Sequence, residues 1–351
     1  MKRHLIILFA GALLLTPNVQ AGNEDRAGSA GATELLINPW ARSSGWGSAG
    51  IASSRGLEAT FLNVAGLAYV DKTEIMFTRT NWMGQAAGIG INGVGLAQKV
   101  GETGALAISV MTMNLGDIMV TTTERPEGGL GVFRPTFANF AVAYAKQFSE
   151  SISGGVNVKV VSQSISNLKA QGVALDAGVR YVTGENDQIK FAISLKNVGA
   201  PMKYSGDGLS ITSQNTFSGM ISTTQQQVSP FELPSLVHIG ASYDFLLSEK
   251  SKLTAAGCYT SNSFTRDQYR LGLEYGMTSD KIVFSLRAGL EYEKGLFSAT
   301  ERATAMSGPS AGFSIDFPSG KNKSLIGIDY TVRITNPFGP VHSVGARIDV
   351  K

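Results

Sequence analysis

Strict alternation of apolar and polar residues is the feature that most constrains what this chain can fold into. From Thr73 to the end, the sequence divides into segments of about ten residues in which alternate side chains are apolar or aromatic. The segments 172–181, 237–245, 269–276 and 282–292 show this pattern clearly. Successive side chains of a strand point to opposite faces, whereas a helix repeats every ~3.6 residues. The pattern therefore predicts an all-β chain.

Fourteen segments with this character can be set out along the chain. The predicted strands are 73–82, 87–100, 105–115, 136–148, 151–164, 172–182, 188–198, 234–246, 251–261, 267–277, 281–292, 307–317, 324–334 and 341–350. An even number of strands brings both termini to one side of a membrane, which we expect to be the periplasm.

Alternation also fits a soluble sandwich with one wet face. Two features favour a transmembrane antiparallel barrel instead. Aromatic residues, including Tyr181, Phe245 and Tyr292, stand at strand ends, as an interfacial girdle requires. The connections also alternate in length. Short turns at 149–150, 183–187, 247–250 and 279–280 alternate with long links at 116–135, 199–233 and 293–306.

The composition supports the same class. Charged residues make up only 16% of the chain, where soluble domains average roughly 25%, and glycine is abundant at 41 residues. Composition alone also fits a soluble β-protein. The net charge of +3 is dispersed, which argues against a nucleic-acid partner. The single cysteine, Cys258, cannot form an internal disulfide and is interpreted as a small buried side chain.

Residues 1–21 have the character of a signal peptide. A positive start at Lys2 and Arg3 precedes the apolar run Leu5–Leu15, which is too short to span a bilayer as a helix. Small residues at Val19 and Ala21 suit a signal peptidase, so cleavage is expected after Ala21. We expect an exported protein whose mature chain begins near Gly22.

Residues 22–72 do not alternate and are expected to form a plug segment ahead of the barrel, 73–351. A barrel of about fourteen strands has a lumen too wide for its own side chains to fill. The run 43–56 is rich in Gly, Ser and Ala and can pack closely, and Trp40, Trp46 and Phe61 are too apolar for an unburied segment. The alternative is a flexible periplasmic tail. We favour the plug.

Charged residues recur opposite the apolar faces of the predicted strands. They are Lys159, Asp176, Arg180, Lys190, Lys196, Asp244, Arg270, Glu274, Arg287, Glu291, Asp329, Arg333, Arg347 and Asp349. An Arg or Lys facing lipid at mid-bilayer costs about 2–4 kcal/mol, so these residues are expected to face the lumen. They either form Arg–carboxylate ladders that brace the strands and hold the plug, or line a polar conduit. Both interpretations disfavour a broad apolar tunnel along this wall.

Signals for catalysis are weak. Gly88, Gly90 and Gly93 match G-x-G-x-x-G, but the run continues as an alternating strand and opens no helix, so a bend or a close approach of the plug is the better interpretation. Only His238 and His342 remain after the leader, and no element carries metal-ligand spacing or a nucleophile elbow. We therefore expect no enzyme, no cofactor and no metal. The competing hypothesis is chemistry assembled from distant loops.

The N-terminal segment resembles the signature of FadL-like barrels, in which an ARA-x-G-x-GGA run precedes a stretch ending NPAGLA. The matching residues are Ala41, Arg42, Gly45, Gly47 and Gly50, then Asn63, Ala65, Gly66 and Leu67. Residues 32–37 and the overall length are most similar to the PorV/PorQ family of the type IX secretion machinery of the Bacteroidota outer membrane. Val64 stands where the motif has Pro, and Lys351 ends a chain that many barrels end with an aromatic residue.

The resemblance implies an outer-membrane barrel of about fourteen strands with a lumenal plug. PorV-like proteins dock beside a translocon pore, capture the C-terminal domain of a cargo protein and pass it to a surface attachment complex; PorQ-like relatives belong to that complex. The expected partners are thus outer-membrane lipid, translocon and attachment-complex proteins, and cargo C-terminal domains. Cargo is expected to meet the loops 116–135 and 199–233. The alternatives are a FadL-type transporter of hydrophobic small molecules and a structural subunit of another outer-membrane assembly.

Overall fold

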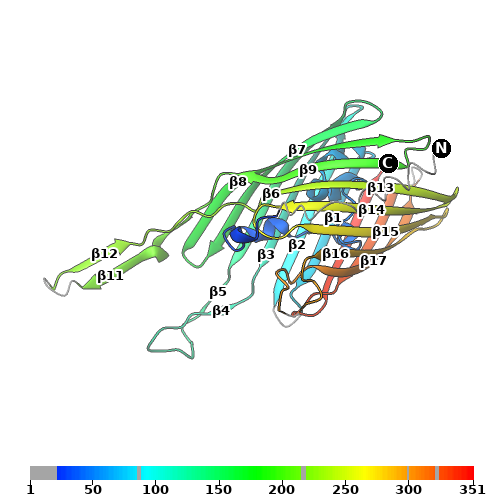
Figure 1. Cartoon of the computed structure of the whole chain (residues 1–351). Coiled ribbons are helices and arrows are strands. Elements are labelled where there is room, and N and C mark those ends of the chain that lie inside the picture. Colours follow the sequence, from blue (N-terminus) through cyan, green and yellow to red (C-terminus); the bar gives the residue numbers. More distant parts are fainter. Residues whose placement is uncertain (1–21, 85–87, 215–218, 299, 321–323) are drawn as a thin grey trace.

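The structure is a computed structural model that describes residues 22–84, 88–214, 219–298, 300–320 and 324–351. The predicted signal peptide, 1–21, lies outside the described residues. The remainder is an all-β barrel that encloses the N-terminal segment (Figure 1).

Fourteen antiparallel strands form the barrel wall. They are β1 (Thr73–Trp82), β2 (Ile89–Val100), β3 (Gly104–Asn114), β6 (Thr136–Gln147), β7 (Ile152–Ile165), β8 (Leu168–Thr183), β9 (Ile189–Gly199), β13 (Leu236–Ser248), β14 (Ser251–Asn262), β15 (Gln268–Thr278), β16 (Val283–Glu293), β17 (Gly308–Ser319), β18 (Ser324–Arg333) and β19 (Val341–Val350). Each pairs with its neighbours, and β19 pairs with β1 to close the ring. The prediction of a fourteen-stranded antiparallel barrel is confirmed.

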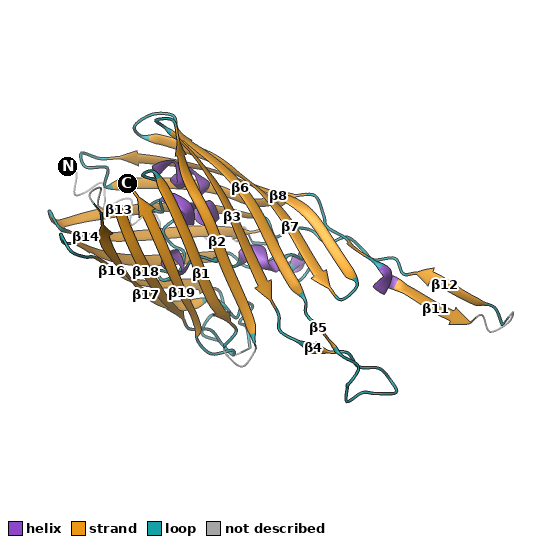
Figure 2. Cartoon of the chain, turned by 180° about the vertical axis from the view of Figure 1, so that it is seen from behind, coloured by secondary structure: helices purple, strands orange, loops and turns teal. Residues whose placement is uncertain are grey.

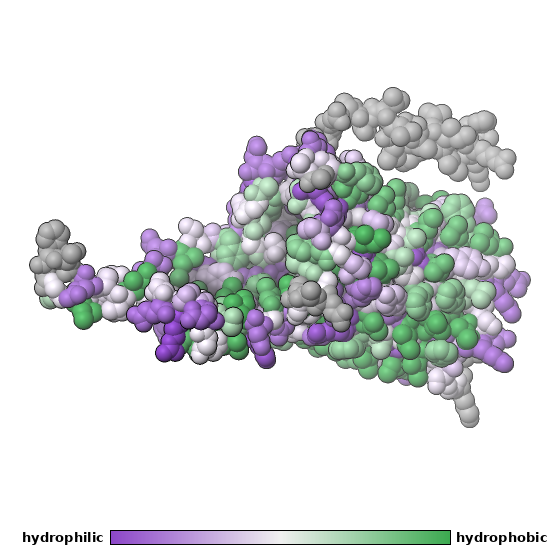
Figure 3. Space-filling model, turned by 90° about the horizontal axis from the view of Figure 1, so that it is seen from below, coloured by the Kyte–Doolittle hydropathy of each residue, from purple (hydrophilic) through white to green (hydrophobic). Residues whose placement is uncertain are grey.

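Each strand has one buried and one exposed face. In β8 the outward Val173, Leu175 and Val179 are exposed, whereas the inward Asp176 and Arg180 are buried. This follows directly from the two-residue period, because alternate side chains of a strand point to opposite faces. Figure 3 shows hydrophobic side chains gathered over the barrel wall and hydrophilic ones toward its ends. The outward rings of Tyr259, Tyr269 and Tyr292 lie in adjacent positions of neighbouring strands, as in an aromatic girdle.

The two ends of the barrel differ. Turns such as 101–103, 148–151 and 249–250 lie at the end where β1 begins and β19 ends, called here the short-turn end. The connections β3–β6 and β9–β13 lie at the opposite, long-loop end.

Both long connections carry small hairpins that project from the barrel (Figure 1). One consists of β4 (Ile118–Met119) and β5 (Val132–Phe133). The other connection contains β10 (Tyr204–Ser205), which pairs with β8, the short helix η6 (Asp207–Leu209), and the hairpin of β11 (Ser210–Gln214) and β12 (Ile221–Gln225). These elements were not predicted. β8 also begins at Leu168 rather than at residue 172. Its first residues were not predicted because the outward Lys169 and Gln171 are polar and break the alternation of apolar and polar side chains.

Short helices occupy the barrel interior (Figure 2). They are η2 (Thr33–Leu36), α2 (Ala41–Ser44), η3 (Gly56–Glu58), α3 (Ala59–Leu62) and η4 (Val64–Tyr69). A further short helix, η1 (Glu24–Arg26), has no buried residue and lies at the long-loop end. Most of residues 40–70 are buried, so this segment is a plug. No helix in the described part of the chain is long and apolar enough to cross a membrane.

The plug crosses the lumen from end to end. It joins β1 at Thr73, at the short-turn end, whereas Gly22 lies against Thr265 and Asp267 in the β14–β15 connection at the long-loop end. The barrel's own ends, Thr73 and Val350, are paired and share one end, as an even number of strands requires. Gly22, the first described residue, therefore lies at the end of the barrel opposite to Thr73 and Val350, and the expectation that both termini are periplasmic stays a prediction. The even number of strands fixes only that β1 begins at the end of the barrel where β19 finishes.

Candidate functional site

Glycines of the wall allow the plug to approach its backbone. A Cβ added to Gly289 would lie 2.1 Å from the carbonyl carbon of Trp46, and one on Gly178 would lie 2.0 Å from Oδ1 of Asn63. A Cβ added to Gly93, from the G-x-G-x-x-G match, would lie 3.1 Å from Cβ of Pro39. Real Cβ atoms do not approach backbone carbons this closely, so the wall is fitted to the plug at the level of single atoms.

Small wall residues also receive the apolar side of the plug. Trp40, Leu57, Val64 and Leu67 are fully buried against a row of wall alanines. The alanines are Ala97, Ala105, Ala107, Ala143 and Ala145, on β2, β3 and β6. Because alanine keeps the wall thin, bulky plug side chains fill the lumen here.

The residues of the family motif are placed within the plug. Ala41 and Arg42 form α2, and Gly45, Gly47 and Gly50 follow in the turns after it. Ala65, Gly66 and Leu67 lie in η4 and are buried. The motif's order of residues thus corresponds to two tight helical turns and the chain between them.

Asn63 caps η4 and ties it to the wall. Its Oδ1 accepts a hydrogen bond from the backbone N–H of Ala65 at 3.2 Å, and its Nδ2 donates to the carbonyl of Val179 at 3.1 Å. Asparagine is a favoured N-cap because its side-chain oxygen satisfies a free backbone N–H. Val64 follows at the first helical position, where the family's proline is also well suited.

Cross-strand ion pairs follow the inner wall of β15 and β16. Arg287 and Glu274 are direct neighbours, with Nε 2.6 Å from Oε2, and Arg270 and Glu291 are likewise paired at 3.2 Å. Arg287 also donates to Oγ of Ser314 at 2.6 Å. Charged groups that are removed from water need a partner of opposite charge, and these contacts give the buried arginines and glutamates of β15 and β16 such partners.

Four more of the candidate lumen charges, Arg347, Asp349, Lys190 and Asp244, also lie in ion pairs. Arg347 lies 2.6 Å from Asp316 and 3.4 Å from Asp349, and Lys190 is bonded to Asp244. Within the plug, Arg42 lies 3.8 Å from Glu58. The arrangement resembles bracing ladders more closely than an open conduit.

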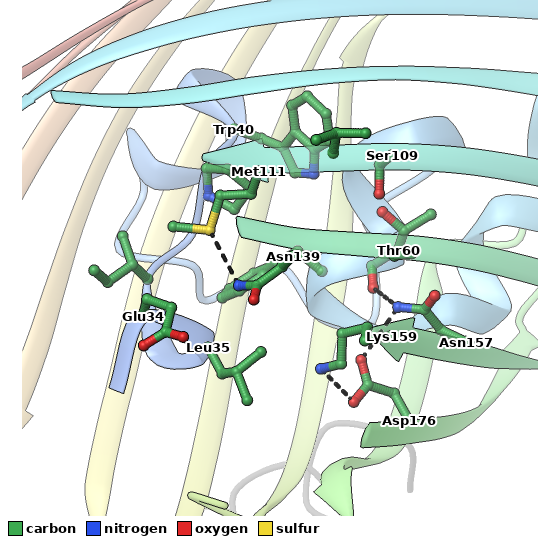
Figure 4. A pocket seen from close by; sticks show the side chains of 15 residues that line it. Glu34, Leu35, Trp40, Thr60, Ser109, Met111, Asn139, Asn157, Lys159 and Asp176 are labelled. Carbon is green, nitrogen blue, oxygen red and sulfur yellow. Dashed lines mark hydrogen bonds and ion pairs between the residues drawn. The ribbon is translucent and has the colours of Figure 1, made fainter. Parts of the chain in front are cut away.

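Asp176 is the centre of a buried polar network that reaches the plug (Figure 4). Its carboxylate lies 2.6 Å from Nζ of Lys159 and accepts from the backbone N–H of Asn197 at 2.8 Å. Asn157 donates to both Asp176, at 3.3 Å, and the Thr60 carbonyl of the plug, at 3.4 Å. The network therefore fixes α3 against β7 and β8.

Arg180, which faces inward on β8 like Asp176, also holds the plug. Its Nη1 donates to the carbonyl of Ser54 at 3.0 Å, and its guanidinium lies 4.4 Å from the ring centroid of Tyr69. Both partners belong to the plug, so this buried cation acts as a clamp rather than as a free charge in a channel.

Several contact residues were missed by the sequence analysis. Asn157, Gln163, Tyr69 and Tyr204 all take part in plug contacts, yet none carries a formal charge. The argument from the cost of facing lipid selected only charged residues. Alternation alone indicates that Asn157 and Gln163 face inward, but it does not indicate what they bond.

The plug is also joined to the β9–β13 connection at the long-loop end. Gly31 donates its backbone N–H to the Glu232 carbonyl at 2.9 Å, and Arg26 lies 2.6 Å from the Glu232 carboxylate. An apolar cluster of Ala32, Leu35, Met202 and Leu233 covers this seam. The base of the largest loop is thus built partly from the plug.

Glu34 extends this seam into the wall. Nε2 of Gln163 donates to both carboxylate oxygens of Glu34, at 3.0 and 2.9 Å, and Tyr204 of β10 donates its hydroxyl to Oε1 of Gln163 at 2.5 Å. Burial raises the pKa of the Glu34 carboxyl above its usual value, although the Gln163 bonds act in the opposite direction.

A cavity of about 510 Å³ lies inside the barrel at the long-loop end. One side is apolar and includes Trp82, Ile89, Met113, Phe137 and Met306. The other side carries Lys196, His238, Arg270, Glu291 and Arg333. The cavity is therefore two-faced, and below it the plug fills the lumen.

The histidines and cysteine do not converge. His238 faces the lumen and bonds Thr260 at 2.8 Å, whereas His342 faces outward and bonds the Tyr330 hydroxyl at 2.8 Å. Cys258 is buried in the wall. Among the described residues, no three His, Cys, Asp or Glu side chains are grouped as a metal site.

A closed fourteen-stranded wall with an N-terminal plug is the fold of the FadL-like barrels. Solved structures with this fold include the toluene transporter TbuX of Ralstonia pickettii (TM-score 0.53, 11% identity, 89% of this chain and 97% of that chain) and a FadL homologue of Pseudomonas aeruginosa (0.53, 13%, 88% and 98%). The toluene transporter TodX of Pseudomonas putida is similar too (0.55, 11%, 89% and 97%). At these identities the likeness concerns the fold alone.

The family is defined by the sequence. Residues 20–261 match the family described as type IX secretion system protein PorV, and the chain belongs to this family. No curated protein matches the chain. The protein is thus an outer-membrane β-barrel of the type IX secretion system, and the resemblance noted from residues 32–72 is confirmed.

Proposed function

We propose that this barrel binds the C-terminal domains of cargo proteins, the translocon, or both, and passes cargo to the surface attachment complex. In this proposal the long-loop end faces the exterior and the barrel ends at Thr73 and Val350 face the periplasm. The observation that carries it is the pair of projecting hairpins, β4–β5 and β11–β12, at one end of a plugged barrel.

The filled lumen supports external handling of cargo. The plug touches the wall at Gly178, Gly289 and Gly312 with no room for a Cβ, and Asn157 and Arg180 hold it by donating hydrogen bonds to its carbonyl groups. A protein chain has no path through such an interior while the plug is in place. Contacts with other proteins therefore belong to the outer surface and the loops.

The loop bases support a docking role. Arg134 and Asp117 form a two-pronged pair below β4–β5, with Nη2 3.0 Å from Oδ2, and this pairing lowers the pKa of Asp117. The β9–β13 connection is fixed to the plug through Gly31 and Glu232. Firm bases reduce the entropy that a loop loses when it binds a partner.

Exact loop removal tests the proposal. The backbone N–H of Gln226 bonds the Leu209 carbonyl at 2.8 Å, and that of Val120 bonds the Gly131 carbonyl at 2.9 Å. Residues 210–225 or 121–130 can therefore be replaced by a two-residue turn without disturbing the base. We expect each variant to assemble as a heat-resistant barrel but to retain less cargo and translocon protein in a pull-down from native outer membranes. Unchanged capture and unchanged cargo release in both variants would refute the loop assignment.

A second candidate is favoured by the two-faced cavity. Its 510 Å³, with apolar residues opposite Lys196, Arg270 and Arg333, fits a hydrophobic small molecule, as in a FadL-type transporter with the plug as hatch. Detergent-exchanged protein should then bind a labelled fatty acid or toluene, and Met113→Arg should abolish binding while cargo capture persists. Absence of binding to both compounds would remove this candidate.

A further inference from the structure

The β11–β12 hairpin is an unsupported two-stranded ribbon. Every residue of Ser210–Gln214 and Ile221–Gln225 is exposed, and Figure 1 shows the hairpin standing clear of the barrel. An isolated hairpin of this length is marginally stable in water, and further strands are what stabilise such a ribbon. The ribbon therefore lacks the third strand that would make it a stable sheet.

The register identifies which backbone groups point outward. Gln226 donates its N–H to the Leu209 carbonyl, so residues 209 and 226 form a hydrogen-bonded pair. In an antiparallel ladder such pairs alternate with non-bonded pairs. The non-bonded pairs are 210 with 225, 212 with 223, and 214 with 221. Their N–H and C=O groups point away from the hairpin, and the 3.1 Å contact between the Thr212 and Thr223 hydroxyls agrees with the closer approach of such pairs.

Neither edge carries the usual protection against pairing. Natural edge strands are shielded by Lys, Pro, bulges or inward charges. The ten residues of β11 and β12 are Ser, Ile, Thr and Gln only, without a charge or a proline. On β12 the outward backbone groups belong to Ile221, Thr223 and Gln225. Two of these residues are β-branched, and Ile221 is 74% exposed.

We propose that the open edge of β12 captures a β-strand of the cargo protein by strand addition. The cargo strand would bond the outward N–H and C=O groups of Ile221, Thr223 and Gln225 and cover the Ile221 side chain. This mode recognises the backbone of the added strand rather than a particular side-chain sequence. The inference rests on the proposed function and specifies how its largest loop acts.

The two threonines give a matched test. Proline at 223 removes an outward N–H without breaking the hairpin's own ladder, because this N–H takes no part in it. Thr212→Pro makes the equivalent change on the other edge, and Thr223→Ala removes the side chain but keeps the N–H. The full-length barrel in nanodiscs is titrated with the purified C-terminal domain of a type IX cargo protein.

We expect Thr223→Pro to weaken binding at least about tenfold, because the variant loses a backbone hydrogen bond and its ring is bulky. Binding by Thr212→Pro and Thr223→Ala should stay close to that of the parent. Hydrogen exchange should show protection of the Thr223 and Gln225 amides on binding, with Thr212 unchanged. Unaltered binding by Thr223→Pro overturns the inference, and so does equal loss in both proline variants. If the replacements of 210–225 and of 121–130 by a turn both leave binding intact as well, the loop assignment of the proposed function fails too. If replacement of 210–225 abolishes binding while Thr223→Pro does not, only the strand-addition inference fails.

Discussion

Single residues on the wall decide whether the plug fits. Gly289 lies so close to Trp46 that an added Cβ would be 2.1 Å from its carbonyl carbon, whereas outward-facing Gly257 meets only Leu271, at 3.6 Å. We expect Gly289→Val to lower the free energy of unfolding by about 1–3 kcal/mol or more through overpacking, and Gly257→Val to change it little. The temperature at which the folded barrel band disappears on a gel measures both. Equal behaviour of the two variants would contradict this account.

Protonation of Glu34 is expected to control the seam between plug and loop. Burial raises its pKa, so the folded state favours the protonated carboxyl. Its stabilising contribution is then complete below the unfolded value, about 4.3, and is lost as pH rises through the folded pKa. Tyr204, which also bonds Gln163, has its own pKa raised by burial and stays neutral in this range.

The test is protection of residues 23–36 against trypsin, which cleaves after Arg26. We expect slower cleavage at pH 5 than at pH 8 after correction for protease activity, and Glu34→Gln should remove the difference. A parent protein without pH dependence, or a variant that keeps it, would be inconsistent with this role of Glu34.

At the scale of elements, β15 and β16 are joined by a buried ion pair. Removing one partner of such a pair leaves an unpaired charge and typically costs about 3–5 kcal/mol. We expect Glu274→Gln to destabilise the barrel in urea titration because Arg287 then lacks its carboxylate. Adding Arg287→Gln should restore part of the loss. The exposed Arg134 and Asp117 pair is the control, and its Asp117→Asn variant should leave barrel stability unchanged.

The elements differ in how far they could be predicted from the sequence. Every barrel strand was predictable because lipid on one face and a plugged lumen on the other enforce a two-residue period. The hairpin strands β11 and β12 were not, because all their side chains are exposed and nothing selects alternate positions. The plug helices were missed for a related reason. Helices of three to six residues, such as η3 and η4, are too short to show a period.

For the whole molecule, the proposed function gives the plug and the loops separate tasks. A Cβ added to Gly345 would lie 3.4 Å from the Cβ of Ala41, close to the spacing of a disulfide. In a Cys258→Ser background, oxidised Ala41→Cys/Gly345→Cys protein should therefore have its plug locked to β19. We expect the locked barrel to release cargo like the parent and to lose any passage of small molecules through the lumen. Loss of cargo release that reduction restores would show that secretion needs plug movement.

The path of the plug through the barrel restricts the direction in which the plug can leave the lumen. Its C-terminal end is joined to Thr73 at the short-turn end of the barrel. Its other described end lies at the long-loop end, where Ala30 forms a β-bridge with Glu232. Because its C-terminal end is joined directly to Thr73, a plug that stays folded can leave the lumen only through the short-turn end. Such a movement would have to break the bonds of Arg26 and Gly31 to Glu232, while the chain stays attached to the wall at Thr73.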